Sequence, residues 1–311
     1  MNNILSKYIK RNLAFALVLT VYGCEIINPE ESIPAIIEIE ELKVEAIEDQ
    51  EGSSFQEITD IWVFVNPEGS EGSDLLGIFP LPATIPILEE GMTSINIQAG
   101  VKLNNQNVNR SVYSLFRSDQ RIIDLKAGET IQLVPVFSYK PPAQIRFDFI
   151  NDFESSNDFV SLTSNIQLEL TSDENLVFEG DKSLTLQLDT INTGFVITTI
   201  NSFRVQKDRN DVNDELPVDE RDTYLEMHYK NDATLFVSVF INSETIPVNI
   251  LRIGAKSEWS KIYIPLKDAL ITANTTSDNP TINIAFEGFL SDGLTTACFS
   301  WDNIKIVHEL L

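Results

Sequence analysis

Apolar and polar residues alternate with a period of two along most of the chain. Ile95 and Ile97, for example, alternate with Ser94, Asn96 and Gln98. Because successive side chains of a strand point to opposite faces, this pattern predicts strands with one buried face. Comparable runs recur at short intervals, and helical periodicity is almost absent from the sequence. The chain is therefore predicted to be all-β.

A pair of prolines, Pro141 and Pro142, separates the alternating segments into two groups. Adjacent prolines stiffen the backbone, and neither can donate a ladder hydrogen bond. We therefore expect a linker at residues 141–145. It joins an N-terminal β-sandwich at residues 36–140 to a C-terminal one at residues 146–311, and both lengths are ordinary for a single domain.

Residues 58–65 form one run that is apolar on both faces, with Trp62 and Phe64 sharing one side. A strand that is apolar on both sides is typically covered on both sides, so we expect this strand to be fully buried. The other two tryptophans, Trp259 and Trp301, also lie in strand patterns, which favours burial in the core over an exposed platform for sugar stacking.

The N-terminus carries three basic residues, Lys7, Lys10 and Arg11, followed by an apolar run at 13–21 and then Gly23-Cys24. The run is shorter than the ~20 apolar residues that span a membrane. In its order of parts this segment resembles a bacterial lipoprotein signal. The resemblance implies removal of residues 1–23 and acylation of Cys24. The alternative is an ordinary cleaved signal peptide with an incidental cysteine.

Residues 24–35 form an acidic, proline-containing tether that we expect to be extended. Glu30 and Glu31 resemble the export signal of Bacteroidetes lipoproteins, which implies an outer-membrane protein displayed on the cell surface. A solvated linker on a periplasm-facing protein is the alternative. Because only Cys24 and Cys298 are present, and the first is expected to carry lipid, no disulfide is predicted.

The formal net charge of the 311 residues is −25. Nucleic-acid binding depends on basic groups that displace counterions, so a nucleic-acid partner is excluded by this charge. Anionic lipid headgroups are disfavoured for the same reason, and membrane residence is expected to depend on the lipid anchor.

Two segments of the first sandwich, residues 62–66 and residues 77–82, together with Gly91 resemble immunoglobulin-like or PEGA-type surface modules. The resemblance spans residues 36–140 and implies an immunoglobulin-like sandwich without a catalytic motif. In the second sandwich, four segments resemble galactose-binding-like jelly rolls, which include many carbohydrate-binding modules; these segments are residues 152–154, 178–184, 259–266 and 301–306.

The jelly-roll resemblance also implies a structural calcium ion held by Glu154, Asp181 and Asp302. Calcium takes six to eight oxygen ligands, which carboxylates and carbonyls at converging strand ends can supply. The alternative, in which Asp302 only caps a turn and Glu154 is solvated, stays open at this point.

Tyr224, Glu226 and His228 alternate onto one face of a predicted strand and are the candidate ligand-binding residues. A solvated outer face is the alternative. No catalytic residue is predicted, because the chain has only two histidines and lacks the metalloprotease, serine-hydrolase and phosphate-loop motifs. A pair of carboxylates acting on a glycoside needs no local motif, so that activity is not excluded.

These features together predict a non-catalytic outer-membrane lipoprotein. The main hypothesis is a protein-interaction subunit of an outer-membrane assembly, secretion or uptake complex, with a membrane-protein partner. The alternative is a cell-surface carbohydrate-binding lipoprotein, which takes a glycan as its ligand.

Overall fold

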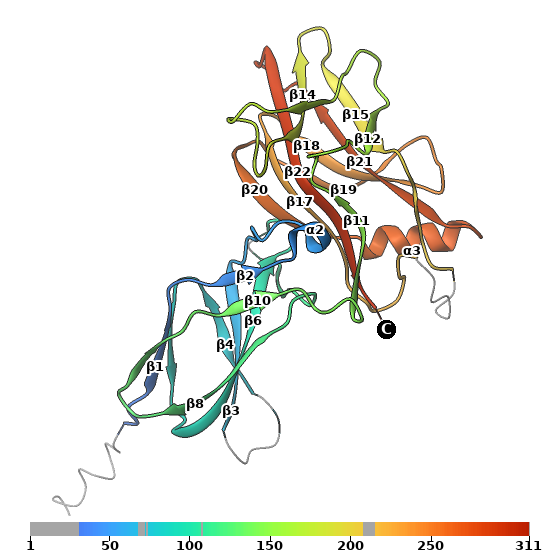
Figure 1. Cartoon of the computed structure of the whole chain (residues 1–311). Coiled ribbons are helices and arrows are strands. Elements are labelled where there is room, and N and C mark those ends of the chain that lie inside the picture. The colour runs from blue at the N-terminus through green and yellow to red at the C-terminus, as the bar shows by residue number, and fades with distance from the viewer. Residues whose placement is uncertain (1–30, 68–71, 73, 107, 208–214, 311) are drawn as a thin grey trace, which may run out of the picture.

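The computed structural model describes residues 31–67, 72, 74–106, 108–207 and 215–310. The strands of these residues build two β-sandwiches, one from each half of the chain, which confirms the all-β fold class (Figure 1). The sequence predicts a jelly roll for the C-terminal sandwich, and we call that sandwich the jelly roll.

The predicted signal peptide, residues 1–23, and the predicted acylation site Cys24 lie outside the described residues, as does the tether up to residue 30. Within the described ranges, no helix is both long enough and apolar enough to cross a membrane. The second cysteine, Cys298, is a free thiol.

The N-terminal sandwich contains a three-stranded sheet in the order β5-β1-β9 and a five-stranded sheet in which β4-β3-β6-β7 are neighbours and β8 also pairs with β6. Strands β2 and β10 form a separate parallel pair. The bounds are β1 Ala35–Ile39, β2 Lys43–Glu45, α2 Glu48–Glu51, β3 Asp60–Pro67, β4 Asp74–Pro80, β5 Ala83–Ile87, β6 Gly91–Lys102, β7 Arg110–Val112, β8 Asp119–Leu125, β9 Thr130–Gln132 and β10 Val136–Ser138.

Strand β3 differs from its sequence prediction. Ile61, Val63 and Val65 are buried in the core, as the alternation predicts. Trp62 and Phe64, however, are only partly buried and lie on the outward face of the five-stranded sheet. The expectation of a strand buried on both faces is therefore wrong, because no layer of the described chain packs over these two rings.

The C-terminal sandwich has two six-stranded sheets. One has the order β13-β14-β22-β17-β20, with β11 on β22, and the other has the order β12-β15-β21-β18-β19, with β16 on β21. The bounds are β11 Ile145–Asn151, β12 Phe159–Ser161, β13 Glu169–Thr171, β14 Ser183–Asp189, β15 Gly194–Thr199, β16 Phe203–Arg204, β17 Thr223–Asn231, β18 Leu235–Ile241, β19 Val248–Ile253, β20 Lys256–Pro265, α3 Lys267–Thr276, β21 Thr281–Phe289 and β22 Thr296–Glu309.

The core of the jelly roll is aromatic at its centre. Trp301 of β22 is fully buried, stacks on Phe286 of the opposite sheet and meets the edge of Phe195. In β17, Leu225 and Met227 point into the same core, so the residues between them point away from it.

The outward side of β17, β20 and β22 is not in solvent, because the N-terminal sandwich covers it. Tyr224, Tyr263 and Val307 belong to the hydrophobic core of the N-terminal sandwich rather than to that of the jelly roll. Asn104 also donates a backbone hydrogen bond of 3.0 Å to the carbonyl of Tyr263. We call the outward residues of this sheet the covered face, which consists of Tyr224, Glu226, His228, Lys261, Tyr263, Asp302 and Lys305.

Candidate functional site

The three predicted ligand-binding residues lie on one face of β17, as the sequence indicates, but that face is the covered face. Tyr224 and His228 are almost completely buried, and Glu226 is completely buried. The prediction that they meet a solvent-borne ligand does not fit this position, and neither does the solvated-face alternative. Sequence alternation correctly located the face, yet it could not show that another domain packs on it.

Glu226 is the centre of a buried charge network that joins the two sandwiches. Its carboxylate accepts hydrogen bonds from Tyr113 and Tyr139 of the N-terminal sandwich, the second at 3.0 Å. It also pairs with Lys261 at 2.7 Å and with Lys305 at 3.8 Å. Both oxygens of this buried carboxylate therefore have partners, and the contacts connect the two sandwiches.

The electrostatics of this network follow from burial opposed by opposite charge. Burial alone would raise the pKa of Glu226, but the two lysines outweigh it and lower the pKa to about 2. Burial lowers the pKa of Lys305 to about 7, although the Glu226 charge acts against that shift. Burial and both lysines hold the pKa of His228 well below its usual value, so this imidazole is neutral.

Lys305 reaches across the interface as well. Its Nζ donates to the backbone carbonyl of Glu51 at 2.6 Å and to the Tyr139 hydroxyl at 3.0 Å. Nearby, the Tyr263 hydroxyl donates to Gln56 at 2.9 Å. The segment between α2 and β3 is therefore fastened to the jelly roll by several polar contacts, and it shields the covered face from solvent.

The predicted calcium residues are only partly brought together. Glu154 and Asp302 line one cavity of about 50 Å³, but Asp181 is not among its lining residues. Glu154 Oε1 already accepts the backbone N–H groups of Asp181 and Lys182. Within the described residues, no group of three or more His, Cys, Asp or Glu side chains is placed to hold a metal ion. Calcium binding at Glu154, Asp181 and Asp302 stays a prediction.

Asp302 of this cavity is nonetheless unusual. It is almost completely buried, and burial raises its pKa to about 7, although hydrogen bonds from the Ser183 hydroxyl and two backbone N–H groups oppose that shift. The Ser183 hydroxyl donates to Asp302 Oδ2 at 2.5 Å, and the Asn303 N–H donates to Oδ1 at 2.7 Å. A capping role for Asp302 agrees with these contacts.

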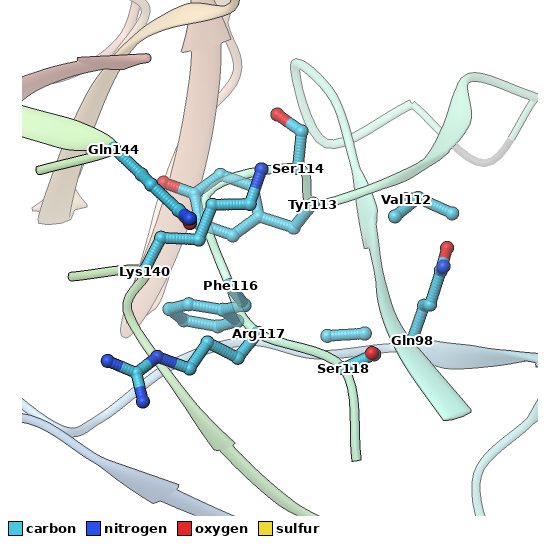
Figure 2. Close-up of a pocket in the computed structure, with 10 residues that line it drawn as sticks. Gln98, Val112, Tyr113, Ser114, Phe116, Arg117, Ser118, Lys140 and Gln144 are labelled. Atoms are coloured by element: carbon cyan, nitrogen blue, oxygen red, sulfur yellow. The ribbon is translucent and has the colours of Figure 1, made fainter. Parts of the chain in front are cut away.

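A larger pocket opens at the N-terminal side of the seam between the sandwiches (Figure 2). Its volume is about 460 Å³, within the range of small-molecule sites. We call it the seam pocket, and it is lined by Gln98, Ala99, Val112, Tyr113, Ser114, Phe116, Arg117, Ser118, Lys140 and Gln144. These residues come from β6, from the end of β7 and the connection that follows it to β8, and from the connection between β10 and β11.

The backbone of the seam pocket is fixed by hydrogen bonds to neighbouring strands. The Tyr113 N–H donates to the Ala99 carbonyl and the Arg117 N–H donates to the Ser138 carbonyl, each at 2.8 Å. In the same pair of segments, the Lys140 N–H donates to the Leu115 carbonyl, also at 2.8 Å. The pocket is therefore formed before any ligand arrives, which reduces the entropy lost on binding.

The polar side chains around the seam pocket can all donate hydrogen bonds, and Figure 2 shows Gln144 and Lys140 on the opposite side from Gln98. Lys140 is held by Glu309 at 2.9 Å. Arg117 is exposed, and no carboxylate of the described chain pairs with it. In a chain of net charge −25, this is an unusual place for two cations without an acidic lining residue. The pocket suits a ligand rich in hydroxyl or carboxylate oxygens.

Sequence reasoning missed the seam pocket, because its residues come from three separate segments and match no motif. One signal was present in the sequence, namely Arg117 and Lys140 within an otherwise acidic protein. The tryptophan predictions gave three outcomes: Trp301 is core, Trp259 is partly buried against Phe178, and Trp62 is on an outward face.

Comparisons with known proteins give only structural similarity. No family model matches the chain, and no curated protein matches it. Among 81 similar solved chains is a carbohydrate-binding module of family 29, with 13% identity and a TM-score of 0.31. The similarity covers 53% of this chain and 87% of that module.

Two further modules show the same level of similarity. A mutant family 29 module complexed with mannohexaose has 13% identity and a TM-score of 0.33, and the match covers 53% of this chain and 92% of that one. A family 61 module in complex with β-1,4-galactotriose has 11% identity and a TM-score of 0.29, with 50% and 89% covered. Those sugars are ligands of those modules.

Proposed function

We propose that this protein is a non-catalytic, lipid-anchored glycan-binding protein of the outer membrane, displayed on the cell surface. The observation that carries the glycan-binding part is the seam pocket. It has a fixed backbone and several hydrogen-bond donors, and no Asp or Glu is among its lining residues. Two of its donors are already engaged from outside the lining, since Lys140 pairs with Glu309 and Ser114 donates to Asp222, which leaves Arg117 as the lining cation without a carboxylate partner among the described residues. This composition suits a sugar, whose hydroxyl groups accept and donate in many directions.

Specific residues would take defined parts in binding. The guanidinium of Arg117 has no carboxylate partner among the described residues and can donate two parallel bonds to a carboxylate or to adjacent hydroxyls. The amides of Gln98 and Gln144 are matched donors and acceptors on opposite walls of the pocket (Figure 2). The rings of Tyr113 and Phe116 are buried and support the floor instead of stacking on the ligand.

The direct test is an oligosaccharide array of neutral and uronic-acid glycans, probed with the chain from Cys24 onward. Arg117→Ala should weaken the binding of every glycan that the wild type binds by about tenfold or more, because a hydrogen bond to a charged group contributes ~1.5 to 3 kcal/mol. Arg252→Ala, which removes an exposed arginine from β19 of the jelly roll, is the matched control. An array without a positive glycan, or equal binding by both variants, contradicts the proposal.

A second candidate function is the protein-interaction subunit predicted from the sequence. It is favoured by aliphatic side chains that are exposed near one end of the five-stranded sheet, namely Met92 of β6 and Ile122 of β8. Affinity isolation from gently solubilised membranes tests it. Recovery of a stoichiometric membrane protein that Ile122→Asp abolishes would support this function, and recovery of the lipoprotein alone would contradict it.

A further inference from the structure

The outward face of the five-stranded sheet carries a combination of side chains that the seam pocket does not use. We call it the open face, and it is formed by Ile78 of β4, Trp62 and Phe64 of β3, Asn96 and Gln98 of β6, and Gln120 of β8. Unlike the covered face, no second sandwich of the described residues packs on it: both aromatic rings are partly exposed, and Ile78 is 40% exposed.

Strand register places these residues in two rows. In the first row Trp62 lies opposite Ile78 on one side and opposite Gln98 on the other. In the second row Phe64 lies opposite Asn96, which lies opposite Gln120. Directly opposite residues have Cβ atoms ~4.5 to 5.5 Å apart, so each ring has an amide side chain directly beside it.

A bulge in the sheet increases the exposed apolar area next to the rings. The register between β3 and β4 shifts between Val63 and Phe64, so that one additional residue fits into β4. Leu76 packs against the core, whereas Leu75 and Ile78 on either side of the bulge are exposed. The outward rings of β3 are thus bordered by aliphatic groups on one side and by amides on the other.

The polar atoms of the open face are not fully used by the protein. Within the described residues, Asn96 Oδ1 and Trp62 Nε1 are buried and have no hydrogen-bond partner, and the exposed Gln120 has a single bond of 3.2 Å to Ser94. The six defining residues carry no charge. An anionic chain would gain nothing from them and would meet the field of a protein with net charge −25, so the face suits an uncharged ligand.

We propose that the open face binds a neutral polysaccharide chain whose pyranose rings lie on Trp62 and Phe64. A pyranose ring presents a C–H face that packs on an aromatic ring, and its hydroxyl groups point outward toward side chains such as Asn96, Gln98 and Gln120. This inference rests on the glycan-binding function proposed above and identifies a second region of the same site.

The open face and the seam pocket are continuous through one residue. Gln98 lies beside Trp62 in the register of β3 and β6, and it also lines the seam pocket. A chain that places one sugar in the pocket can therefore extend over the sheet without crossing a gap. The resulting binding should be length-dependent, because only longer chains contact both regions.

The test is calorimetric titration of the chain from Cys24 onward with mannohexaose, cellohexaose, β-1,4-galactohexaose and the corresponding trisaccharides. Trp62→Ala should weaken hexasaccharide binding by about tenfold. It should also reduce the ratio of the affinity for the hexasaccharide to that for the trisaccharide. Trp62→Phe, which keeps a ring, should restore most of the affinity. Phe289→Ala removes an exposed ring from β21 and is the matched control, with unchanged affinity expected.

The outcomes separate this inference from the function on which it rests. If Arg117→Ala weakens binding while Trp62→Ala and Trp62→Phe both bind like the wild type, glycan binding stands and the open-face site is wrong. If no neutral oligosaccharide binds the wild type, the open-face site is wrong as well. If Trp62→Ala instead loses a membrane-protein partner in an affinity isolation, the face is a protein-binding surface and the inference is overturned.

Discussion

The covered face and the open face are both outward sheet surfaces with aromatic and polar side chains. The covered face is buried between the two sandwiches, whereas the open face is partly exposed to solvent. On the covered face, Glu226 and Lys305 are completely buried, Lys261 is almost completely buried, and both lysines form ion pairs with Glu226. On the open face, Trp62 and Phe64 are partly exposed and lie among uncharged amides. Charged networks tolerate burial only when all members are paired, whereas neutral amides beside exposed rings remain able to bind a ligand.

The largest effect should come from breaking the covered face. Glu226→Gln leaves Lys261 and Lys305 buried without a carboxylate, so the free energy of unfolding should fall by roughly 3 to 5 kcal/mol at pH 7. The loss should be smaller at pH 9, because burial already lowers the pKa of Lys305 to about 7 and the lysine can then release its proton.

Chemical denaturation measures this loss. Glu220→Gln is the control, since Glu220 forms an exposed ion pair with Lys267 and its replacement should change stability by no more than about 0.5 kcal/mol. Equal stabilities for the two variants would show that the covered face is not a joint held by charge.

The second effect uses the pH dependence of Asp302, also on the covered face. Its folded-state pKa is raised to about 7, so between about pH 4 and pH 7 the folded protein binds a proton that the unfolded chain has released. The contribution of Asp302 to the free energy of unfolding is therefore largest at low pH. It falls by up to about 4 kcal/mol as the pH rises through that window.

Thermal or chemical unfolding at a series of pH values, with Asp302→Asn beside the wild type, isolates this group. The variant should lack the decline, and its stability relative to the wild type should increase from pH 4 to pH 8. A constant difference across the series would mean that Asp302 titrates normally and is not desolvated.

A smaller effect is expected from the open face itself. Trp62→Ala removes a partly exposed ring, so it should lower the free energy of unfolding by only about 1 kcal/mol. Trp301→Ala, in the jelly-roll core, should cost roughly 3 to 5 kcal/mol. If both substitutions lower the free energy of unfolding by the same amount, Trp62 is packed like a core residue and the face is not open.

The smallest effect concerns calcium. Because Glu154 Oε1 and both oxygens of Asp302 already accept protein hydrogen bonds, millimolar calcium or a chelator should change the melting temperature little. A calcium-dependent rise that Glu154→Gln abolishes would instead establish the structural calcium site predicted from the sequence, and it would place a cation at the edge of the covered face.

The sequence predicted the strands and the fold class well, because alternation is a local property of each strand. The inward residues of β1, β3 and β6 are buried as their period of two requires, and Trp301 is core. The same pattern also placed Tyr224, Glu226 and His228 together on one outward face. It predicted their direction correctly.

What covers an outward face depends on contacts between residues far apart in sequence, and alternation carries no information about them. Glu226 is buried by Tyr113, which is 113 positions away, and Trp62 stays partly exposed although its strand is apolar on both sides. The seam pocket has the same origin, since Gln98 and Arg117 meet Gln144 only after the sandwich and the linker have folded.

Glycan binding at the open face is tested by a proton–nitrogen correlation spectrum of the three tryptophan indoles, recorded with and without a bound neutral hexasaccharide. We predict that the Trp62 indole signal shifts on binding while those of Trp259 and Trp301 do not. A shift of the Trp259 signal with Trp62 unchanged would place the ligand on the jelly roll and contradict glycan binding at the open face.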